Sequence, residues 1–516
     1  MKKLLLSVMI LIVVLMSSMV LACEKPSNHT HNYVDTVVNP TCTEDGYTLH
    51  KCECGDEYTD TVVTKTGHNY AVSTVTATCT EDGYTLHKCE CGDEYKDNVV
   101  PAKGIHDKVN SQNVCEECNT ELAYTKNLQY AKIDTDVIEG YTQGYMLSGL
   151  GTSTDTNIII PHYYEGLPVV SIKESAFRMN KNITSVQIPN TVREIGKSAF
   201  SYCDNLTNVV IGSNVTTIKA TAFNNCKNLS NIELPDGVTS LGSSAFNGTQ
   251  YYDNKDNWDN GLLYIGKYLV ASKEDRNLQS EITIKDGTVL IADSTFYMRK
   301  KIEKVTIPDS VEFIGERAFY ECLYITEWKM SNKIKKIGNY AFYYCMFTSI
   351  TLSDMITEIP LGAFYGCSNL QSIVLPDSIT SIQGEAFRGC MSLTSITIPQ
   401  GVTELHDYTF NNCTSLTEII IPNSVTKIGK YVFSACSLLQ KVIIPDSVEY
   451  IDSEAFIYCT SLTEIIIPNS VTYMGVDVFG GCTNLIIYCE AESQPETWFD
   501  GWNSPNIPVV WGVQKI

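Results

Sequence analysis

The stretch SLTEIIIPNSVTKIG (residues 415–429) decides the fold of this chain, because it returns at 461–475 in nearly the same letters. A phenylalanine follows each copy, and this marker recurs along most of the chain. The thirteen markers are Phe177, Phe200, Phe223, Phe246, Phe296, Phe319, Phe342, Phe364, Phe387, Phe410, Phe433, Phe456 and Phe479. They are 23 residues apart, except for one gap of 22 and one of 50, so one copy carries an insertion of 27 residues.

The pattern within one copy predicts a β-rich coil. In the quoted copy, Leu416, Ile419 and Ile421 point to one side of a short strand. Pro422 ends this strand, since proline has no N–H for a further ladder bond. Gly429 is expected to allow a bend, and the residues before each phenylalanine to form a brief helical or 3₁₀ turn. One such coil cannot bury its own apolar edge, so the copies are expected to stack into a solenoid.

These residues carry a resemblance to a known family. The steps Leu-x-x-Ile-x-Ile-Pro, Val-x-x-Ile-Gly and Ala-Phe-x-x-Cys resemble the BspA-like class of leucine-rich repeat, which is found in bacterial surface proteins. The resemblance covers Tyr141 to about Cys489, and the segment EGLPVV (165–170) resembles the family's lead-in. It implies a β-rich α/β solenoid, a right-handed superhelix of 23-residue coils. It also implies adhesion or protein interaction rather than enzymatic activity.

The N-terminus predicts export and lipid anchoring. A basic start (residues 1–3) is followed by an apolar run (4–20) and then by Leu21-Ala22-Cys23. This order is typical of a secretory signal peptide. The ending resembles the lipobox of bacterial lipoproteins, which implies that Cys23 carries the lipid. A retained transmembrane anchor is the rival interpretation, because about 20 apolar residues suffice to span a bilayer.

Two copies of a small Cys/His module follow, with a shortened third copy. The repeated segments are HNY (31–33 and 68–70), TCTEDGY (41–47 and 78–84) and HKCECGDEY (50–58 and 87–95). Three cysteines cannot pair off within one copy, whereas three cysteines and a histidine suit tetrahedral zinc. The candidate metal ligands are Cys42, Cys52, Cys54 and His68 in one copy, and Cys79, Cys89, Cys91 and His106 in the next.

The role of these modules has alternatives. The histidine that precedes each set of cysteines, His31 or His68, fits the spacing as well as the one that follows it. Disulfides that pair across copies are the second option, because an exported chain meets an oxidising compartment. Free thiols are the third. In every case the role is structural, because a module of about 37 residues is too small to hold a core unaided.

A second set of cysteines follows the phenylalanine marker by three residues. Its members are Cys203, Cys226, Cys322, Cys345, Cys367, Cys390, Cys413, Cys436, Cys459 and Cys482, to which Cys489 is added. Stacked coils would place them in a ladder close enough for disulfides. We expect instead small buried residues at a tight inner turn, since each cysteine has two equivalent neighbours and no reason to choose one.

The strand position between two inward residues predicts a surface row. It holds Ile420, Ile443 and Ile466 on three neighbouring coils, and an exposed apolar stripe of this kind is a candidate protein-binding patch. The charged residues beside it are Glu418, Lys441 and Glu464. The alternative is that β-branched residues merely suit strands.

Composition and charge limit the function classes. Among 516 residues, 59 are acidic and 37 basic, for a net charge of −22. A nucleic-acid binder would need a basic footprint. We therefore expect a protein ligand on a host, a matrix or a neighbouring cell, contact with the membrane through the lipid anchor only, and no nucleic acid. A metal-handling surface protein is the alternative function, and zinc is the one cofactor expected.

The expected organisation follows the chain in order. It comprises a signal peptide (1–22), a lipidated linker (23–28), two and a half Cys/His modules (29–118), an N-terminal cap that leads into the solenoid (119–175), leucine-rich repeats with an insertion near 247–273 (176–486), and a C-terminal cap (487–516). The mature protein is expected outside the cytoplasm, held to the bacterial membrane by lipid and exposed at the surface. Three tryptophans in the cap, Trp498, Trp502 and Trp511, are expected to cover the open end of the core.

Overall fold

The structure, a computed structural model, describes residues 30–79, 81–100, 108–133, 141–504 and 506–514. The chain divides into two compact units, Met1–His106 and Asp107–Ile516. The predicted signal peptide, the lipid-carrying Cys23 and the candidate ligand His106 lie outside the described residues. Within the described ranges, no helix has the length and apolar character needed to cross a bilayer.

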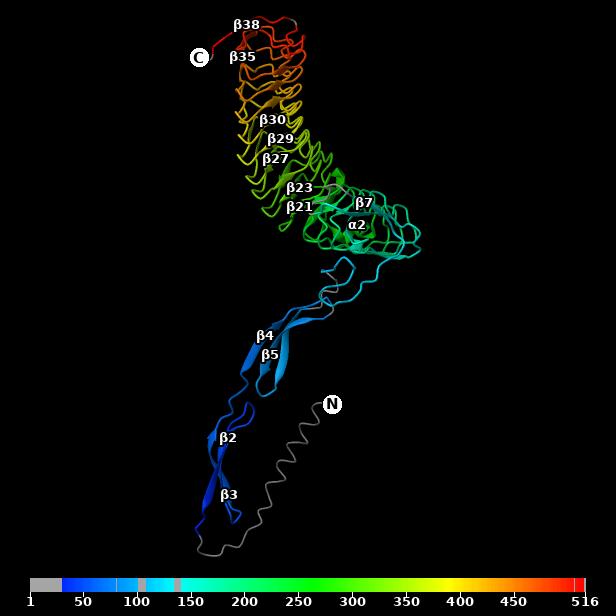
Figure 1. Cartoon of the computed structure of the whole chain (residues 1–516), viewed down its shortest axis with the longest axis vertical. Helices are drawn as coiled ribbons and strands as arrows, with labels where there is room; N and C mark the ends of the chain where they lie inside the picture. Colours follow the sequence, from blue (N-terminus) through cyan, green and yellow to red (C-terminus); the bar gives the residue numbers. More distant parts are fainter. Residues whose placement is uncertain (1–29, 80, 101–107, 134–140, 505, 515–516) are drawn as a thin grey trace. The chain divides into compact units, whose positions relative to one another are not determined.

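The first unit contains two modules of one design, each a three-stranded antiparallel sheet in which neighbours along the chain pair (Figure 1). The strands are β1 (Tyr33–Val38), β2 (Gly46–Cys52) and β3 (Glu57–Val63) in the first module, and β4 (Tyr70–Val75), β5 (Gly83–Cys89) and β6 (Glu94–Val100) in the second. The register pairs Tyr33 with Cys52 and Tyr70 with Cys89. Each module therefore has one end with a Cys-x-Cys turn and an opposite end with a loop that holds the third cysteine.

These modules have almost no hydrophobic core. Across the described residues of 30–100, the buried residues are two glycines and three cysteines: Gly46, Cys52, Cys79, Gly83 and Cys89. Valines on the strands are exposed. What packs instead is a small aromatic group, in which the rings of His87 and Tyr95 stack at 4.4 Å. Sheets this small and this exposed need a further source of stability.

The second unit is a solenoid of about sixteen turns, each about 23 residues long (Figure 1). In most coils the first strand is short, and runs of two or three of these strands pair in parallel along the stack, as when Ile420 lies opposite Ile443. These strands are β9 (Asn157–Ile159), β12 (Ser185–Gln187), β14 (Asn208–Val210), β20 (Glu281–Thr283), β22 (Lys304–Thr306), β24 (Glu327–Lys329), β26 (Ser349–Thr351), β28 (Ser372–Val374), β31 (Glu418–Ile420), β33 (Lys441–Ile443), β35 (Glu464–Ile467), β37 (Ile486–Cys489) and β38 (Val509–Trp511).

A second parallel ladder runs along another side of the coils. It begins after the turn that Pro422 and its equivalents start, where the N–H of Val425 donates to the Pro422 carbonyl at 3.0 Å. Its strands are β11 (Leu167–Ile172), β13 (Glu194–Ile195), β15 (Thr217–Ile218), β16 (Ser240–Leu241), β21 (Leu290–Ile291), β23 (Phe313–Ile314), β25 (Lys336–Ile337), β27 (Glu358–Ile359), β29 (Ser381–Ile382), β30 (Glu404–Leu405), β32 (Lys427–Ile428), β34 (Tyr450–Ile451) and β36 (Tyr473–Met474).

Gly429 ends the second strand of its coil, and its role differs from the expected bend. Its φ is not positive, but a Cβ placed on it would meet the Asp407 carboxylate at 2.6 Å and the Leu405 carbonyl at 2.9 Å. The backbone of the previous coil approaches too closely for a side chain. The glycine is thus required by the contact between coils.

The third side of each coil consists of tight turns, so the expected brief helical or 3₁₀ turn was wrong. The segment around Phe433 forms consecutive tight turns, with left-handed Tyr431 (φ 56°) two residues before it and left-handed Ala435 (φ 60°) two residues after it. Two left-handed residues so close together break a helix. The backbone N–H groups of Phe433 and Ala435 donate to the next coil instead, each at 2.8 Å. The coil is therefore almost entirely β and turn.

The phenylalanines stack inside the solenoid, one per coil. The ring of Phe410 lies 5.6 Å from that of Phe387 and 5.7 Å from that of Phe433, nearly parallel to both. The second set of cysteines lies beside this column and is buried, as expected. Ten of these thiols have a role that the sequence did not suggest: each donates to the carbonyl of a phenylalanine in the previous coil, as Cys413 does to Phe387 at 3.2 Å.

The solenoid begins with a short sheet and carries its insertion as an extra hairpin. The N-terminal strands are β7 (Gln129–Ile133), β8 (Gly144–Gly149) and β10 (Tyr163–Tyr164). The insertion contains α2 (Gln250–Asp253), η1 (Lys255–Asn257), β17 (Trp258–Asp259), β18 (Leu262–Ile265) and β19 (Tyr268–Ser272), and η2 (Asp275–Asn277) follows it. β19 pairs with β21 and so occupies a place in the second ladder. The coil stack turns near this point (Figure 1).

At the C-terminal end, Trp498 and Trp502 are buried against the last coils, with ring centroids 5.0 Å apart. The ring of Trp502 also meets Phe479, the last member of the phenylalanine column, at 6.4 Å. Trp511 is half-buried beside them. These rings shield the apolar edge that the last coil leaves open.

The phenylalanine column leads to a stability prediction. Phe410→Ala should lower the free energy of unfolding by about 3–5 kcal/mol, because it opens a cavity between two stacked rings. Phe499→Ala is the control, since the Phe499 side chain is 54% exposed, and it should change stability by no more than about 0.5 kcal/mol. Urea unfolding followed by circular dichroism measures both. Equally small effects would show that the column does not hold the coils together.

The buried thiols lead to a pH prediction. Burial raises the pKa of Cys413 well above its usual value, so this thiol stays protonated in the folded chain after its unfolded counterpart ionises. Its stabilising contribution is present below about pH 8.5 and is lost as the pH rises toward the folded pKa. The stability advantage of the parent over Cys413→Ser should therefore shrink by up to about 1.4 kcal/mol per pH unit above pH ~9. Urea titrations at pH 7 and pH 10 test this, and an unchanged difference would contradict it.

Candidate functional site

The first ladder presents one residue per coil to solvent, between two inward apolar residues. The orientation predicted for Ile420, Ile443 and Ile466 is confirmed, and the equivalent residues of the other coils are exposed as well: Gln187, Val210, Glu233, Thr283, Thr306, Lys329, Thr351, Val374 and Thr397. Residues of adjacent strands in a row of this kind lie side by side, because neighbouring strands are about 4.8 Å apart. Within each run of paired strands, the row is therefore a continuous surface.

The C-terminal part of this row is apolar. Ile420, Ile443 and Ile466, which we call the isoleucine stripe, are 64%, 48% and 51% exposed. Tyr488 lies opposite Ile466 in the neighbouring strand, and Val510 lies opposite Tyr488. The apolar surface thus continues into the C-terminal cap. Sequence reasoning missed this extension because the cap does not keep the 23-residue period.

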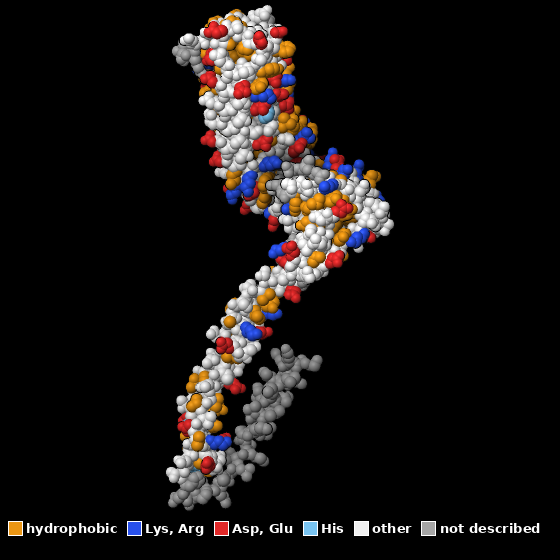
Figure 2. Space-filling view, viewed as in Figure 1, with side chains coloured by type: hydrophobic (Ala, Val, Ile, Leu, Met, Phe, Trp, Pro, Cys, Tyr) orange, Lys and Arg blue, Asp and Glu red, His pale blue; other side chains and the backbone are white. Residues whose placement is uncertain are grey.

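A charged margin accompanies the isoleucine stripe. Glu418, Lys441 and Glu464 are exposed and stand two residues before the three isoleucines, so they point to the same side of the sheet. Glu418 lies opposite Lys441 in the register. On the visible face of the solenoid, lysine and arginine side chains lie among acidic ones, and hydrophobic side chains gather along one border of the C-terminal coils (Figure 2).

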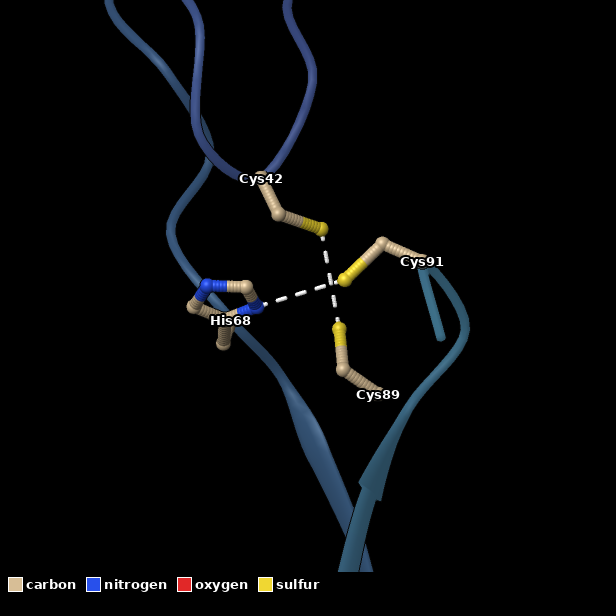
Figure 3. Close-up of side chains that lie close together, drawn as sticks. All are labelled: Cys42, His68, Cys89 and Cys91. Atoms are coloured by element: carbon tan, nitrogen blue, oxygen red, sulfur yellow. Dashed lines mark hydrogen bonds between the residues drawn. The ribbon is translucent and has the colours of Figure 1, made fainter. Parts of the chain in front are cut away.

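The second candidate site brings four predicted metal ligands together in the first unit. Cys42, His68, Cys89 and Cys91 point toward one another, and we call them the inter-module cluster (Figure 3). Their donor atoms all lie within 4.8 Å of one another. The Sγ atoms of Cys42 and Cys89 are 3.6 Å apart, and the Nδ1 atom of His68 is 3.3 Å from the Sγ of Cys91.

This arrangement corrects the predicted grouping, in which each copy used its own three cysteines and the next histidine. Cys42 lies at the end of its sheet opposite Cys52 and Cys54, and strands of six or seven residues keep the two ends about 20 Å apart. Cys42 therefore meets the second module. Because Tyr70 is paired with Cys89, His68 lies beside the turn of its own module, so the preceding histidine is the partner.

The remaining predicted ligands are distributed differently. Cys52 and Cys54 form a three-donor group with His31, the preceding histidine of their own module. Cys79 lies in the loop between β4 and β5, at the end of the sheet away from Cys89 and Cys91. The shortened third copy belongs to the second unit, where Cys115 forms an isolated bridge with Val109.

Another histidine of the repeat, His50, has a different role. Its ring nitrogens contact Asp35 at 2.6 Å and Asp60 at 2.8 Å, and it therefore links three strands. Both carboxylates raise the pKa of His50, and the hydrogen bond to Asp60 contributes most. His50 stands two residues before Cys52, nearer in the sequence than His68 is to any cysteine, so closeness in the sequence does not identify the candidate ligand.

The thiols of the inter-module cluster differ in pKa. Hydrogen bonding from the Cys91 backbone, followed by the His68 side chain, lowers the pKa of Cys89 to about 6. Cys42 acts as a hydrogen-bond donor to Cys91 and Cys89, which raises its pKa to about 11. The turn of the first module behaves similarly, because the Cys54 backbone lowers the pKa of Cys52 to about 7.

The second unit thus has the form of a repeat solenoid with an extended, exposed strand face, and proteins of this class serve as binding scaffolds. The sequence profile described as BspA type leucine rich repeat region (6 copies) matches residues 156–275, 255–371, 289–409 and 357–486. The chain belongs to this family, as its repeat pattern predicted. Leucine-rich repeat proteins generally bind other proteins.

Two solved structures are among those similar to the chain. A leucine-rich repeat protein from Bacteroides ovatus is 26% identical, with 76% of this chain and 100% of that chain covered and a TM-score of 0.39. A leucine rich cell surface protein from Faecalibacterium prausnitzii is 24% identical, with 77% and 96% covered and a TM-score of 0.30. None of the curated proteins compared matches the chain.

Proposed function

We propose that this protein is a lipid-anchored bacterial surface protein that binds a protein on a host, a matrix or a neighbouring cell through the isoleucine stripe. The observation that carries the proposal is that three β-branched side chains, each about half exposed or more, stand on consecutive coils. An exposed apolar patch with polar surroundings is typical of a protein-binding surface. The acidic charge of the chain argues against nucleic acid as the ligand.

The position of the stripe supports a binding role over a mere preference of strands for β-branched residues. At the same strand position, Thr283, Thr306 and Thr351 satisfy that preference with a polar side chain. Threonine, which is also β-branched, suits this strand position and remains polar, yet isoleucine stands on three successive coils. Val210 and Val374 are also exposed in this row, but each stands between polar residues on both neighbouring coils, so only the C-terminal end holds successive apolar side chains.

The backbone under the stripe favours binding as well. Ile420 and Ile443 stand on paired strands, and each strand continues into a buried core residue. A surface held this firmly loses little conformational freedom when a partner docks. The alternating margin of Glu418, Lys441 and Glu464 would set the orientation of the partner, since charges at a rim contribute specificity more than affinity.

The stripe leads to a binding prediction. Changing Ile420, Ile443 and Ile466 together to glutamate should weaken binding at least ~100-fold, because central apolar contacts carry most of the affinity at protein interfaces. The matched control places glutamate at Thr283, Thr306 and Thr351, which stand at the same strand position on other coils. It adds the same charge and should bind like the parent.

Binding is measured to an immobilised extracellular-matrix preparation, to intact epithelial cells and to bacterial cells, with circular dichroism to check folding. If a surface captures the parent and the isoleucine variant equally, the stripe is not the binding site. If the threonine variant loses binding to the same extent, net charge rather than the stripe governs adhesion.

Membrane attachment is the second part of the proposal. The basic start, the apolar run and Leu21-Ala22-Cys23 support export followed by lipid attachment at Cys23. An acidic chain gains nothing from an anionic membrane surface, so the lipid has to supply the anchorage. The Cys/His modules follow Cys23 directly in the chain and would serve as spacers between the lipid and the solenoid.

The anchor leads to a localisation prediction. Cys23→Ser should move the protein from the membrane fraction of the producing bacterium to the soluble fraction, and should abolish incorporation of a labelled fatty acid. Cys203→Ser, in the buried set, should leave both unchanged. A Cys23→Ser protein that stays in the membrane fraction would favour a retained transmembrane segment over the lipid.

A further inference from the structure

We propose that a single zinc ion joins the first Cys/His module to the second, held by Cys42, His68, Cys89 and Cys91. The site is independent of ligand binding by the solenoid. It differs from a zinc site within one module, because its four donors come from two consecutive copies of the repeat. Its function is to fix the order and spacing of the modules.

The donor set fits zinc in both type and number. Three thiols and one imidazole form a common structural zinc site, and such sites are closed by four protein ligands. The turn around Cys89 and Cys91 supplies two donors, the chain just before β4 supplies His68, and the loop before β2 supplies Cys42. Soft thiolates select zinc over calcium and magnesium, which take oxygen ligands.

The distances also fit. Zinc lies about 2.3 Å from sulfur and about 2.0–2.1 Å from nitrogen, so the edges of its tetrahedron are about 3.8 Å between two sulfurs and about 3.6 Å between sulfur and nitrogen. The observed separations are 3.6 Å for the Cys42 and Cys89 sulfurs and 3.3 Å for His68 Nδ1 and the Cys91 sulfur. Two of the six separations thus lie within about 0.3 Å of these edges, and all six are within 4.8 Å.

The exposure of the two sheets is an independent reason to expect a stabilising metal ion. Apart from cysteine and glycine, every described residue of 30–100 is at least partly exposed. Val34 and Val72, on the first strand of each module, are 68% and 63% exposed. A three-stranded sheet without an apolar face is marginal in water, and small domains with this deficit rely on metals or disulfides.

The chain between the modules is already positioned for such a link. The N–H of Thr66 donates to the carbonyl of Thr41 at 3.0 Å, and the N–H of Lys65 donates to the Asp45 carboxylate at 2.6 Å. These bonds hold the segment before His68 against the loop that carries Cys42. The zinc ion would add a second link between the two modules at the same place.

The test measures bound zinc by mass spectrometry of the elements in the purified full chain. Cys42→Ser should bind one zinc per chain fewer than the parent, whereas Cys413→Ser, which removes a buried solenoid thiol, should bind as much as the parent. At the histidine position, His68→Ala should also bind one zinc ion per chain fewer than the parent, whereas His68→Cys should bind as much as the parent. Comparing these two variants shows whether zinc is lost because a ligand is missing or because the module is misfolded.

A second measurement, limited proteolysis, tests how firmly the segment between the two modules is held. Trypsin should cleave after Lys65 at least ~10-fold faster once a chelator has removed zinc, and adding Zn²⁺ back should restore protection in the parent but not in Cys42→Ser. If Cys42→Ser keeps the parent's zinc content and protection, the proposal is wrong. It is equally wrong if Cys42 and Cys89 prove to be joined by a disulfide, seen as a fragment pair that separates only under reduction.

Discussion

The solenoid depends on hydrogen bonding between coils that are 23 residues apart. The N–H of Phe410 donates to Val432 of the next coil, and the N–H of Gly429 donates back to Leu405 of the previous one, at 2.9 and 2.8 Å. No coil satisfies its own backbone or covers its own apolar edge. The regular spacing of the strands follows from this dependence, because a change of one residue within a paired strand would reverse its inward and outward faces. The single 22-residue spacing, from Phe342 to Phe364, leaves β26 and β28 paired in register. The insertion keeps the stack intact, because β19 takes a place in the second ladder beside β21.

Much of the solenoid could be predicted because its inward residues repeat. Leu416, Ile419 and Ile421 are all buried, and Pro422 begins the turn as expected. The turns around the phenylalanines could not be predicted, since their left-handed positions hold residues such as Tyr431 and Ala435 rather than glycine. What stabilises those conformations is bonding to the neighbouring coil, and a single repeat contains no trace of it.

The candidate metal ligands show a different limit of sequence reasoning. Their chemical types were evident, but their partners depend on strand register, because pairing of Tyr70 with Cys89 decides that His68 joins the turn of its own module. Identical copies also conceal whether Cys42 belongs with its own module or with the next. Strand length settles this, since the sheet separates its two ends. The isoleucine stripe was easier to predict, because alternation along a strand needs no knowledge of distant contacts.

The near identity of residues 415–429 and 461–475 has a consequence for how the length of the stack could change. Segments this similar are interchangeable units of the solenoid. Because each coil presents the same donors and acceptors to both neighbours, the loss or gain of one coil leaves two compatible faces to rejoin. The removal or addition of a whole coil would therefore change the length of the isoleucine stripe while the pairing between coils is kept.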